Sequence, residues 1–378
     1  MIESVNPLEP AIVNDPIRHL FLALVLFGSS VLARAGEMPW IEVAEDKKGF
    51  VLTPSGHPFV TWGFNYDHDT DGRLLEDYWE SEWPAVEAHF DQMKKLGANV
   101  IRINLQLGKF MDGPHSANEK SLDRLANLVA LAERLHLYLD LTGLGCYHKK
   151  DVPTWYDKLS EKDRWDVQAL FWRAIAGRVN KSPAIFCYDL MNEPVVPGGR
   201  GTDGNWLGPP FAGSYFVQFI TLDRRDRPRH EIARQWIRHL TAAIRQSGHR
   251  HLITVGLVDW SLDRPGLSSG FIPSKIVDDL DFVSVHLYPA TGKVNEALQT
   301  LKGFAVGKPV IIEETFPLKC SANELGEFID QSASVASGWI GFYWGKPPGE
   351  LRRSKELGDA MLLEWLTVFE QRAAASSK

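Results

Sequence analysis

The stretch Ala184–Pro194, which reads AIFCYDLMNEP, decides the fold of this chain. It is a nearly continuous apolar run that ends in Glu193, as expected of a parallel strand buried on both faces. A second run, Lys308–Glu314 (KPVIIEE), has the same form and ends in Glu313 and Glu314. Barrel enzymes carry their catalytic groups at the carboxyl ends of such strands. The two runs therefore predict both a fold and a site.

Eight strand-like runs alternate with helical patterns across residues 40–372, and no linker or internal repeat separates them. Alternation of this kind predicts a parallel α/β fold. Eight such units in 378 residues fit a (β/α)8 TIM barrel, whereas the alternative, a doubly wound sheet, rarely needs eight. The predicted strands are Phe59–Phe64, Asn99–Leu105, Leu137–Thr142, Ile185–Leu190, Leu252–Val258, Phe282–Leu287, Pro309–Glu314 and Trp339–Trp344.

Three further segments can be placed around these strands. Glu119–Leu135 has apolar residues at 3.6-residue spacing, which predicts an amphipathic helix. Residues 40–58 read as an N-terminal β-hairpin, which we expect to cap the N-terminal mouth of the barrel. The segment from Val195 to about Pro228 is a long loop after strand 4, rich in Gly, Pro and aromatic residues. A loop of this length in a compact domain is usually functional.

The N-terminus reads as a targeting segment. Arg18 precedes an apolar stretch, Leu20–Leu32, and the small-x-small sequence Ala33–Ala35 follows. This layout predicts a signal peptide over residues 1–35, with an uncleaved signal anchor as the alternative, and a secreted or periplasmic protein. Residues 36–378 then form a single catalytic domain.

Composition limits the classes of partner. The chain has 41 Lys and Arg against 48 Asp and Glu, a formal charge of −7. A mildly acidic protein is a poor electrostatic match for nucleic acid or an anionic membrane surface. We predict a monomer with no nucleic-acid partner. Three cysteines allow at most one disulfide, for which Cys146 and Cys320 are the candidates.

Two carboxylates suffice to cleave a glycosidic bond. One protonates the leaving oxygen, and the other acts on the opposite side of the anomeric carbon. If the two lie about 5–5.5 Å apart, the second attacks directly and the configuration is retained. Strands four and seven face each other across a barrel, so we expect Glu193 and Glu314 at that separation.

The strand-four motif Asn192-Glu193-Pro194, together with Glu314 on strand seven, resembles clan A glycoside hydrolases, most closely the cellulase family, family 5. The resemblance covers about residues 55–350. Further positions match the family pattern on the expected strands: Arg102 on strand two, His286 and Tyr288 on strand six, and Trp344 on strand eight.

The resemblance implies a role for each of these residues. Glu193 would be the general acid/base, and Glu314 would be the nucleophile, oriented and kept ionised by Arg102 and Tyr288. Asn192 would bond the sugar 2-hydroxyl. The full set expected at the substrate is Arg102, Asn192, His286, Tyr288 and Trp344, the last offering a ring face to the sugar.

Glu313 competes with Glu314 for the role of nucleophile. Adjacent residues of a strand point to opposite faces, so the family register selects Glu314 and leaves Glu313 behind it or between strand and helix. The sequence departs from the family where Glu313 replaces a glycine and where Thr142 replaces a histidine of strand three. These departures affect the expected substrate more than the reaction.

The function predicted is that of a retaining glycoside hydrolase that cleaves a β-linked polysaccharide or oligosaccharide, with endo-β-1,4-glucan as the first candidate. A β-mannan is the closest rival, and β-1,3-glucan follows. An inactive carbohydrate-binding barrel is the non-enzymatic alternative. Gly199–Gly204 resembles a dinucleotide fingerprint, but no helix follows it, and no zinc motif is present. No cofactor and no metal are predicted.

Overall fold

Eight parallel strands close into a barrel, as predicted. In hydrogen-bonding order they are β12 (Leu252–Val258), β13 (Val283–His286), β14 (Val310–Thr315), β15 (Gly338–Gly341), β4 (Thr61–Tyr66), β5 (Val100–Gln106), β8 (Tyr138–Gly145) and β9 (Ile185–Asn192). The computed structural model describes residues 1, 38–198 and 204–376, and the predicted signal segment lies outside them, apart from Met1. Residues 38–378 form one compact unit.

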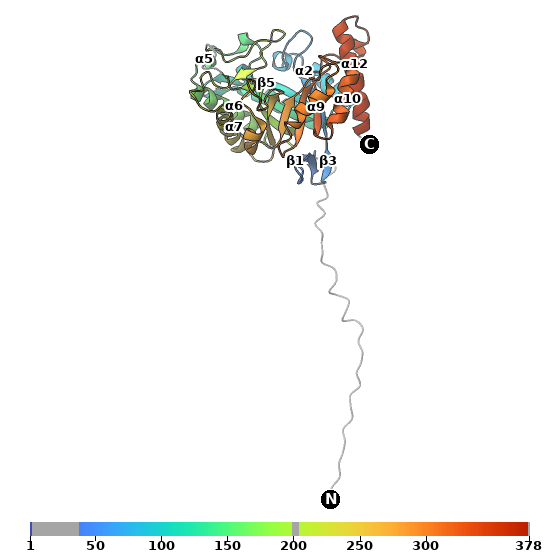
Figure 1. Ribbon diagram of the computed structural model, residues 1–378, viewed down its shortest axis with the longest axis horizontal. Coiled ribbons are helices and arrows are strands. Elements are labelled where there is room, and N and C mark those ends of the chain that lie inside the picture. Colours follow the sequence, from blue (N-terminus) through green and yellow to red (C-terminus); the bar gives the residue numbers. More distant parts are fainter. Residues whose placement is uncertain (2–37, 199–203, 377–378) are drawn as a thin grey trace. The chain divides into compact units, whose positions relative to one another are not determined.

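Helices follow the strands along the chain and lie around the outside of the barrel (Figure 1). The longer ones are α2 (Trp83–Lys95), α4 (Glu119–Leu135), α6 (Glu161–Val179), α7 (Arg229–Arg245), α9 (Val294–Lys302), α10 (Ala322–Ser332) and α12 (Leu357–Ser376). One-turn helices are α1 (Leu75–Tyr78), α3 (Leu107–Phe110), α5 (Thr154–Asp157), α8 (Pro273–Ile276) and α11 (Pro348–Leu351), with 3-10 turns η1 (Lys149–Asp151) and η2 (Val277–Asp279). Within the described residues, no helix is both long and apolar enough to cross a membrane.

Local sequence signals set where several of these helices begin. Asn118 caps α4 by accepting a hydrogen bond from the Ser121 backbone N–H, 2.8 Å away. Ser321 and Glu324 form a reciprocal capping box at the start of α10. Such caps satisfy backbone donors that have no partner within the helix. Side chains at the starts of α4 and α10 therefore fix these two boundaries.

The predicted N-terminal hairpin is a three-stranded antiparallel sheet of β1 (Trp40–Val43), β2 (Phe50–Thr53) and β3 (His57–Phe59). Phe50 packs edge-on against Phe186, which lies near the start of β9, with ring centroids 5.2 Å apart. Phe59 packs against Tyr138, the first residue of β8, at 5.1 Å. These contacts confirm that the hairpin covers the N-terminal mouth of the barrel.

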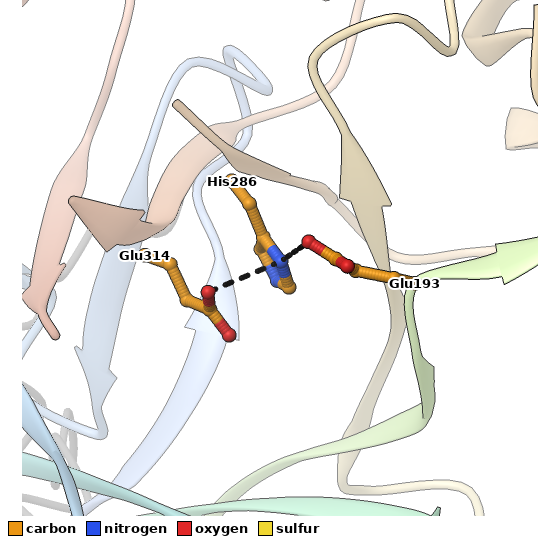
Figure 2. Close-up of side chains that lie close together, drawn as sticks. All are labelled: Glu193, His286 and Glu314. Carbon is orange, nitrogen blue, oxygen red and sulfur yellow. Dashed lines mark hydrogen bonds and ion pairs between the residues drawn. The ribbon is translucent and has the colours of Figure 1, made fainter. Parts of the chain in front are cut away.

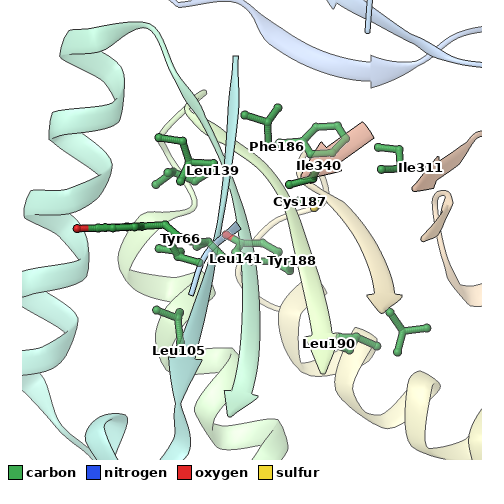
Figure 3. Close-up of a cluster of buried hydrophobic side chains, with 14 of the residues drawn as sticks. Tyr66, Leu105, Leu139, Leu141, Phe186, Cys187, Tyr188, Leu190, Ile311 and Ile340 are labelled. Carbon is green, nitrogen blue, oxygen red and sulfur yellow. The ribbon is translucent and has the colours of Figure 1, made fainter. Parts of the chain in front are cut away.

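Successive residues of a barrel strand point alternately toward the helices and toward the interior, and on β8 the residues that point inward are polar. On β8, Leu139 and Leu141 belong to the buried apolar cluster that Figure 3 draws, together with Tyr188 of β9. The residues between and after them, Asp140 and Thr142, face the interior, where the Thr142 hydroxyl donates to Asp189 at 2.8 Å. The apolar side of each strand thus packs against the helices, and charged groups fill the centre of the barrel.

Strand β14 contains a bulge at the position of the second predicted carboxylate. Against β13, Val285 pairs with Ile312 and His286 pairs with Glu314, so Glu313 is an extra residue. The pairing with β15 shifts in the same interval. A bulge re-aims side chains and is common beside active sites. Here it turns two consecutive glutamates toward the same side of the strand.

The segment between β9 and α7 is the long loop predicted after strand four. It contains β10 (Pro194–Val195), which pairs with β11 (Gln218–Phe219), and isolated bridges join Leu207 to Gln218 and Phe211 to Ser214. A second small sheet, β6 (Met111–Gly113) with β7 (Ser116–Ala117), follows β5. The described part of the long loop is thus held by backbone hydrogen bonds beside the carboxyl end of β9.

Candidate active site

Glu193 and Glu314 meet at the carboxyl end of the barrel, with His286 between them (Figure 2). A carboxylate oxygen of Glu193 lies within 4.8 Å of a carboxylate oxygen of Glu314. His286 Nδ1 lies 2.9 Å from Glu193 Oε1 and 3.4 Å from Glu314 Oε2. The barrel therefore brings together the two carboxylates that the sequence places on strands four and seven.

The backbone at Glu193 has an uncommon conformation. Its φ is 46°, in the left-handed region, which costs a non-glycine residue roughly 1 kcal/mol or more. Its N–H donates to the Gly256 carbonyl of β12 at 3.0 Å. The bond to the neighbouring strand holds the turn that directs the Glu193 side chain toward His286.

Glu314 is held by two strong hydrogen bonds. Arg102 Nη1 donates to its Oε1 at 2.6 Å, and the Tyr288 hydroxyl donates to its Oε2 at 2.7 Å. The side chain is only 10% exposed. Each carboxylate oxygen of Glu314 therefore has a donor that orients it. The contacts expected from Arg102 and Tyr288 are therefore present in the structure.

Arg102 is completely buried and organises the floor of the site. Its Nη2 donates to Asp189 and to Asn192 Oδ1, each at 2.9 Å, and its Nη1 also donates to Asn65 at 2.9 Å. Burying a charged group is costly unless it is paired. This network engages both terminal nitrogens of the guanidinium, and Arg102 supports Glu314 from below without lining the pocket.

Glu313 faces the barrel interior and lies behind the site, as one of the two expectations had it, and not between strand and helix. Its side chain has no exposed area, and its Oε2 lies 3.3 Å from His286 Nε2 and 3.7 Å from Arg102 Nη2. The alternation rule fails because the β14 bulge places Glu313 and Glu314 on the same side. Glu313 thus contacts the ring nitrogen of His286 that points away from Glu193.

Asp140 completes a group of buried carboxyls with Asp189 and Glu313. Burial, and then the charge of Glu313, raise the pKa of Asp140 well above its usual value, although Arg102 opposes the shift. Neither Asp140 oxygen accepts a hydrogen bond from a nitrogen or hydroxyl donor in the described part of the chain. A protonated Asp140 that donates to Glu313 satisfies both groups, and the site then carries one fewer negative charge.

His286 is an imidazolium at neutral pH. Burial alone would lower its pKa, but the charge of Glu314 and hydrogen bonds to Glu193 and Glu313 raise the pKa of His286 to about 10. Both ring nitrogens then carry protons. Nδ1 faces the two predicted catalytic carboxylates, and Nε2 faces Glu313. The ring cation reduces the repulsion between two carboxylates held this close together.

Two groups of side chains have the spacing of metal ligands: Glu193, His286 and Glu314, and the group of Asp140, Asp189 and Glu313. A metal requires the neutral form of imidazole, whereas the carboxylates around His286 favour its protonated form. In the second group, the Arg102 guanidinium already supplies the positive charge. Both groups are therefore better described as ion-pair networks.

A cavity of about 420 Å³ opens beside the two glutamates. In the described part of the chain, its walls come from the loops after β4, β9, β13, β14 and β15, and most of the lining side chains are apolar. They are His68, Glu193, Pro209, Phe211, Ala212, Phe216, Val217, Tyr288, Glu314, Phe316, Leu318, Phe342 and Tyr343. Of the five residues expected at the substrate, Tyr288 is among them, whereas Arg102, Asn192, His286 and Trp344 are not.

Trp344 does not offer a ring face to this cavity. Its side chain is 1% exposed and packs against Phe64, with ring centroids 5.9 Å apart. Strand β15 ends at Gly341, three residues earlier than predicted, and the chain then turns, so that Phe342 and Tyr343 reach the cavity instead. The sequence alone did not predict the early end of this strand.

Asn192 lies below the cavity, with both ends of its amide engaged. Its Oδ1 accepts from Arg102, and its Nδ2 donates to the Phe216 carbonyl of the long loop at 3.1 Å. Asn192 thereby joins the floor of the site to the loop above it. One N–H of this amide is therefore already used, and only the other could donate the predicted hydrogen bond to a sugar hydroxyl.

Known proteins confirm the family. A family model described as cellulase (glycosyl hydrolase family 5) matches residues 53–344. The chain belongs to glycosyl hydrolase family 5. This family 5 protein is thus a hydrolase of glycosidic bonds, and its two strand-end glutamates lie inside the matched segment. Comparison with curated protein sequences gives no match.

Solved structures share the fold at low sequence identity. An exo-β-1,4-mannosidase from Opitutaceae bacterium strain TAV5 superposes with a TM-score of 0.65 at 16% identity, over 88% of this chain and 62% of that one. An endo-1,4-β-mannanase from Rhizomucor miehei gives 0.61 at 18%, over 89% and 99%. A β-1,4-mannanase from the sea hare Aplysia kurodai gives 0.63 at 15%, over 88% and 96%. The family 5 hydrolase therefore spans less than two thirds of the first of these relatives.

Proposed function

We propose that this family 5 hydrolase is a retaining β-glycosidase, with Glu314 as the nucleophile and Glu193 as the general acid/base. The observation that carries the proposal is the short distance between the two carboxylates, within 4.8 Å between oxygens. Retaining enzymes hold their carboxyls about 5–5.5 Å apart, whereas inverting enzymes leave about 6.5–9.5 Å for a water molecule. The separation here suits direct attack.

The surroundings of the two glutamates divide the roles. Glu314 accepts hydrogen bonds from Arg102 and Tyr288, which suits an anion that attacks the anomeric carbon. The Glu193 side chain contacts His286 Nδ1 at 2.9 Å, and 17% of it is exposed. It can therefore exchange a proton with the leaving oxygen and later with water. Double displacement through a glycosyl ester on Glu314 follows.

Two polymers are candidates for the substrate. A β-1,4-glucan is the first choice from the sequence, through the cellulase family. A β-1,4-mannan is the second, because the structures that share the fold include proteins named as mannanases and a mannosidase. The two sugars differ in the orientation of the 2-hydroxyl, and assays on cellulose derivatives, mannan and the matching nitrophenyl glycosides separate them.

Azide rescue tests the roles directly. In Glu193→Ala, azide enters on the face left by the leaving group, so a β-glycosyl azide is expected from a nitrophenyl β-glycoside. In Glu314→Ala, azide replaces the nucleophile, and an α-glycosyl azide is expected. We expect each alanine variant to lose about 10²–10⁴-fold in kcat without azide. Wild-type rates in both variants would instead show that the catalytic residues are misassigned, whereas no cleavage by the wild type would support the inactive, carbohydrate-binding alternative.

The targeting segment is a separate proposal. Residues 1–35 are proposed to direct the chain out of the cytoplasm and to be removed. Sequencing the N-terminus of the exported protein tests this, and a mature chain that begins at Gly36 is the expected result. A chain that stays in the membrane fraction with residues 1–35 attached would indicate the anchor instead.

A further inference from the structure

The wall of the candidate active site is apolar in a way that a polysaccharide does not require. Phe211 is 64% exposed and Leu318 is 49% exposed, and both line the cavity that contains Glu193 and Glu314. Exposing large apolar side chains is costly in water, so an apolar patch beside a site usually marks contact with an apolar group. The question is which group covers this one.

The long loop holds Phe211 in place by backbone bonds. Phe211 and Ser214 exchange two hydrogen bonds of 2.9 and 3.0 Å across a tight turn. Below the turn, the Gly208 N–H donates to the Val217 carbonyl at 2.8 Å, and the Tyr215 N–H donates to the Tyr147 carbonyl at 2.9 Å. This ribbon presents Phe211 at its tip, opposite the segment after β14 that carries Leu318.

Few polar groups in the wall remain free to bind hydroxyls. The Tyr288 hydroxyl donates to Glu314, and His68 Nδ1 pairs with Asp67 at 2.8 Å. The other contributors are mostly apolar: the aliphatic side chains of Pro209, Val217 and Leu318 lie beside the aromatic rings of Phe211, Phe216, Phe316, Phe342 and Tyr343. A polymer of sugars would place many hydroxyls against this wall without partners, which is unfavourable.

We propose that the cavity binds the apolar aglycone of a β-glycoside, a leaving group that carries an alkyl chain. The inference rests on the proposed retaining function, because it places one sugar between Glu193 and Glu314 and the alkyl chain along the wall. The ribbon that presents Phe211 belongs to the loop that directly follows Glu193, and the general acid must lie beside the leaving oxygen. The reaction releases an alcohol whose oxygen takes its proton from Glu193.

A chain-length series tests the proposal. Ethyl, butyl, hexyl and octyl β-glycosides of the sugar that the enzyme accepts are assayed below their critical micelle concentrations. Each methylene that moves from water to the wall is expected to raise kcat/KM roughly two- to fourfold. We expect the hexyl glycoside to exceed the ethyl glycoside by at least about tenfold, followed by a plateau when the wall is filled.

Variants of the wall test the assignment of the residues. Phe211→Ser and Leu318→Ser, alone and combined, are expected to lower the ratio of hexyl to ethyl kcat/KM, toward one in the double variant. Leu267→Ser is the matched control, because Leu267 is 52% exposed but does not line the cavity. Its ratio is expected to equal that of the wild type. Both wall residues are on the surface, so circular dichroism should show folded variants.

Three results would overturn the inference, and they differ in whether they also overturn the proposed retaining function. If the ethyl glycoside is cleaved and kcat/KM does not rise with chain length, the aglycone site is wrong, but the proposed retaining function still stands. No cleavage of any glycoside removes both. If sedimentation shows a wild-type dimer that Phe211→Ser converts to a monomer with an unchanged hexyl-to-ethyl ratio, the wall is a self-association surface instead.

Discussion

His286 binds carboxylates through both of its ring nitrogens, and Glu313 is the partner that lies away from the reacting groups. The Nε2 contact with Glu313 is 3.3 Å, and the Nδ1 contact with Glu193 is 2.9 Å. Hydrogen bonds to Glu193 and Glu313 and the charge of Glu314 outweigh burial in setting the His286 pKa. Glu313 is therefore a positioning residue, which acts on the reaction through His286.

Replacing Glu313 by Gln tests this at the level of a single charge. The imidazolium loses one anionic partner, so the pKa of His286 falls and the alkaline limb of the kcat/KM profile moves to lower pH. We expect roughly a tenfold loss in kcat/KM above pH 10 for each unit by which the pKa falls, and little loss below pH 6. Glu313→Asp keeps the charge and serves as the control. An alkaline limb that does not move in Glu313→Gln would show that Glu313 has only a structural role.

Residue patterns were enough to locate the reacting pair but not its supports. Glu193 and Glu314 were predicted because each ends an apolar strand, and such positions meet at one end of a barrel. The inward orientation of Glu313 could not be predicted, because the alternation rule assumes a regular strand, and nothing in KPVIIEE marks the bulge. The places of Asp140 and Asp189 in the ion-pair network could not be predicted, because a lone aspartate in a strand does not reveal which buried cation it faces.

Among the elements of the fold, β12 approaches the ion-pair network closely at Gly256, where the Glu313 side chain of β14 lies near its backbone. Gly256 of β12 lies opposite the bulge, and a Cβ at that position would lie 3.0 Å from Glu313 Oε2, 3.0 Å from His286 Nε2 and 3.2 Å from Arg102 Nη2. The absence of a side chain at Gly256 therefore makes room for the network.

Gly256→Ala is expected to disturb both stability and activity. Inserting a methyl group into a packed site costs about 1–3 kcal/mol in the free energy of unfolding, and displacing the Arg102 contacts should lower kcat/KM more than about tenfold. Chemical denaturation and steady-state kinetics measure the two effects. Gly177→Ala, in α6 with its nearest neighbour 3.7 Å away, is the control. It should raise stability by about 0.5–1 kcal/mol, and equal behaviour of the two variants would contradict this account.

The elements themselves could be predicted well, apart from their ends. All eight strands follow from apolar runs, and the helix Glu119–Leu135 follows from apolar residues at 3.6-residue spacing. The end of β15 was placed three residues too late, because the apolar sequence continues through Trp344 while the chain has already turned. The family resemblance placed Trp344 at the substrate, whereas its side chain is buried in the core.

At the scale of the whole molecule, two buried histidines should set opposite limits on stability. Burial lowers the pKa of His251 to about 4, so its contribution is complete above pH 6.5 and is lost as pH falls toward 4. The pKa of His286 is raised to about 10, so its contribution is complete below pH 6.5 and is lost as pH rises toward 10.

The free energy of unfolding should therefore peak near pH 6.5. Each histidine contributes a slope of up to about 1.4 kcal/mol per pH unit within its own window. Urea denaturation from pH 4 to pH 10 measures the profile. His251→Gln keeps a donor for the Ser182 carbonyl but cannot titrate, so it should flatten the acid side and leave the alkaline side as it is. A flat wild-type profile from pH 6.5 to pH 10 would show that His286 is not held as a cation.

The most direct test of the central claim is to trap the covalent intermediate. A 2-deoxy-2-fluoro glycoside of the accepted sugar, with an activated leaving group, slows both steps and should leave the sugar esterified to the enzyme. Peptide mass mapping is expected to place one sugar on the peptide that contains Glu314, and Glu314→Gln should take up none. A label on Glu193, or complete turnover to a product of inverted configuration with no label, would contradict the account.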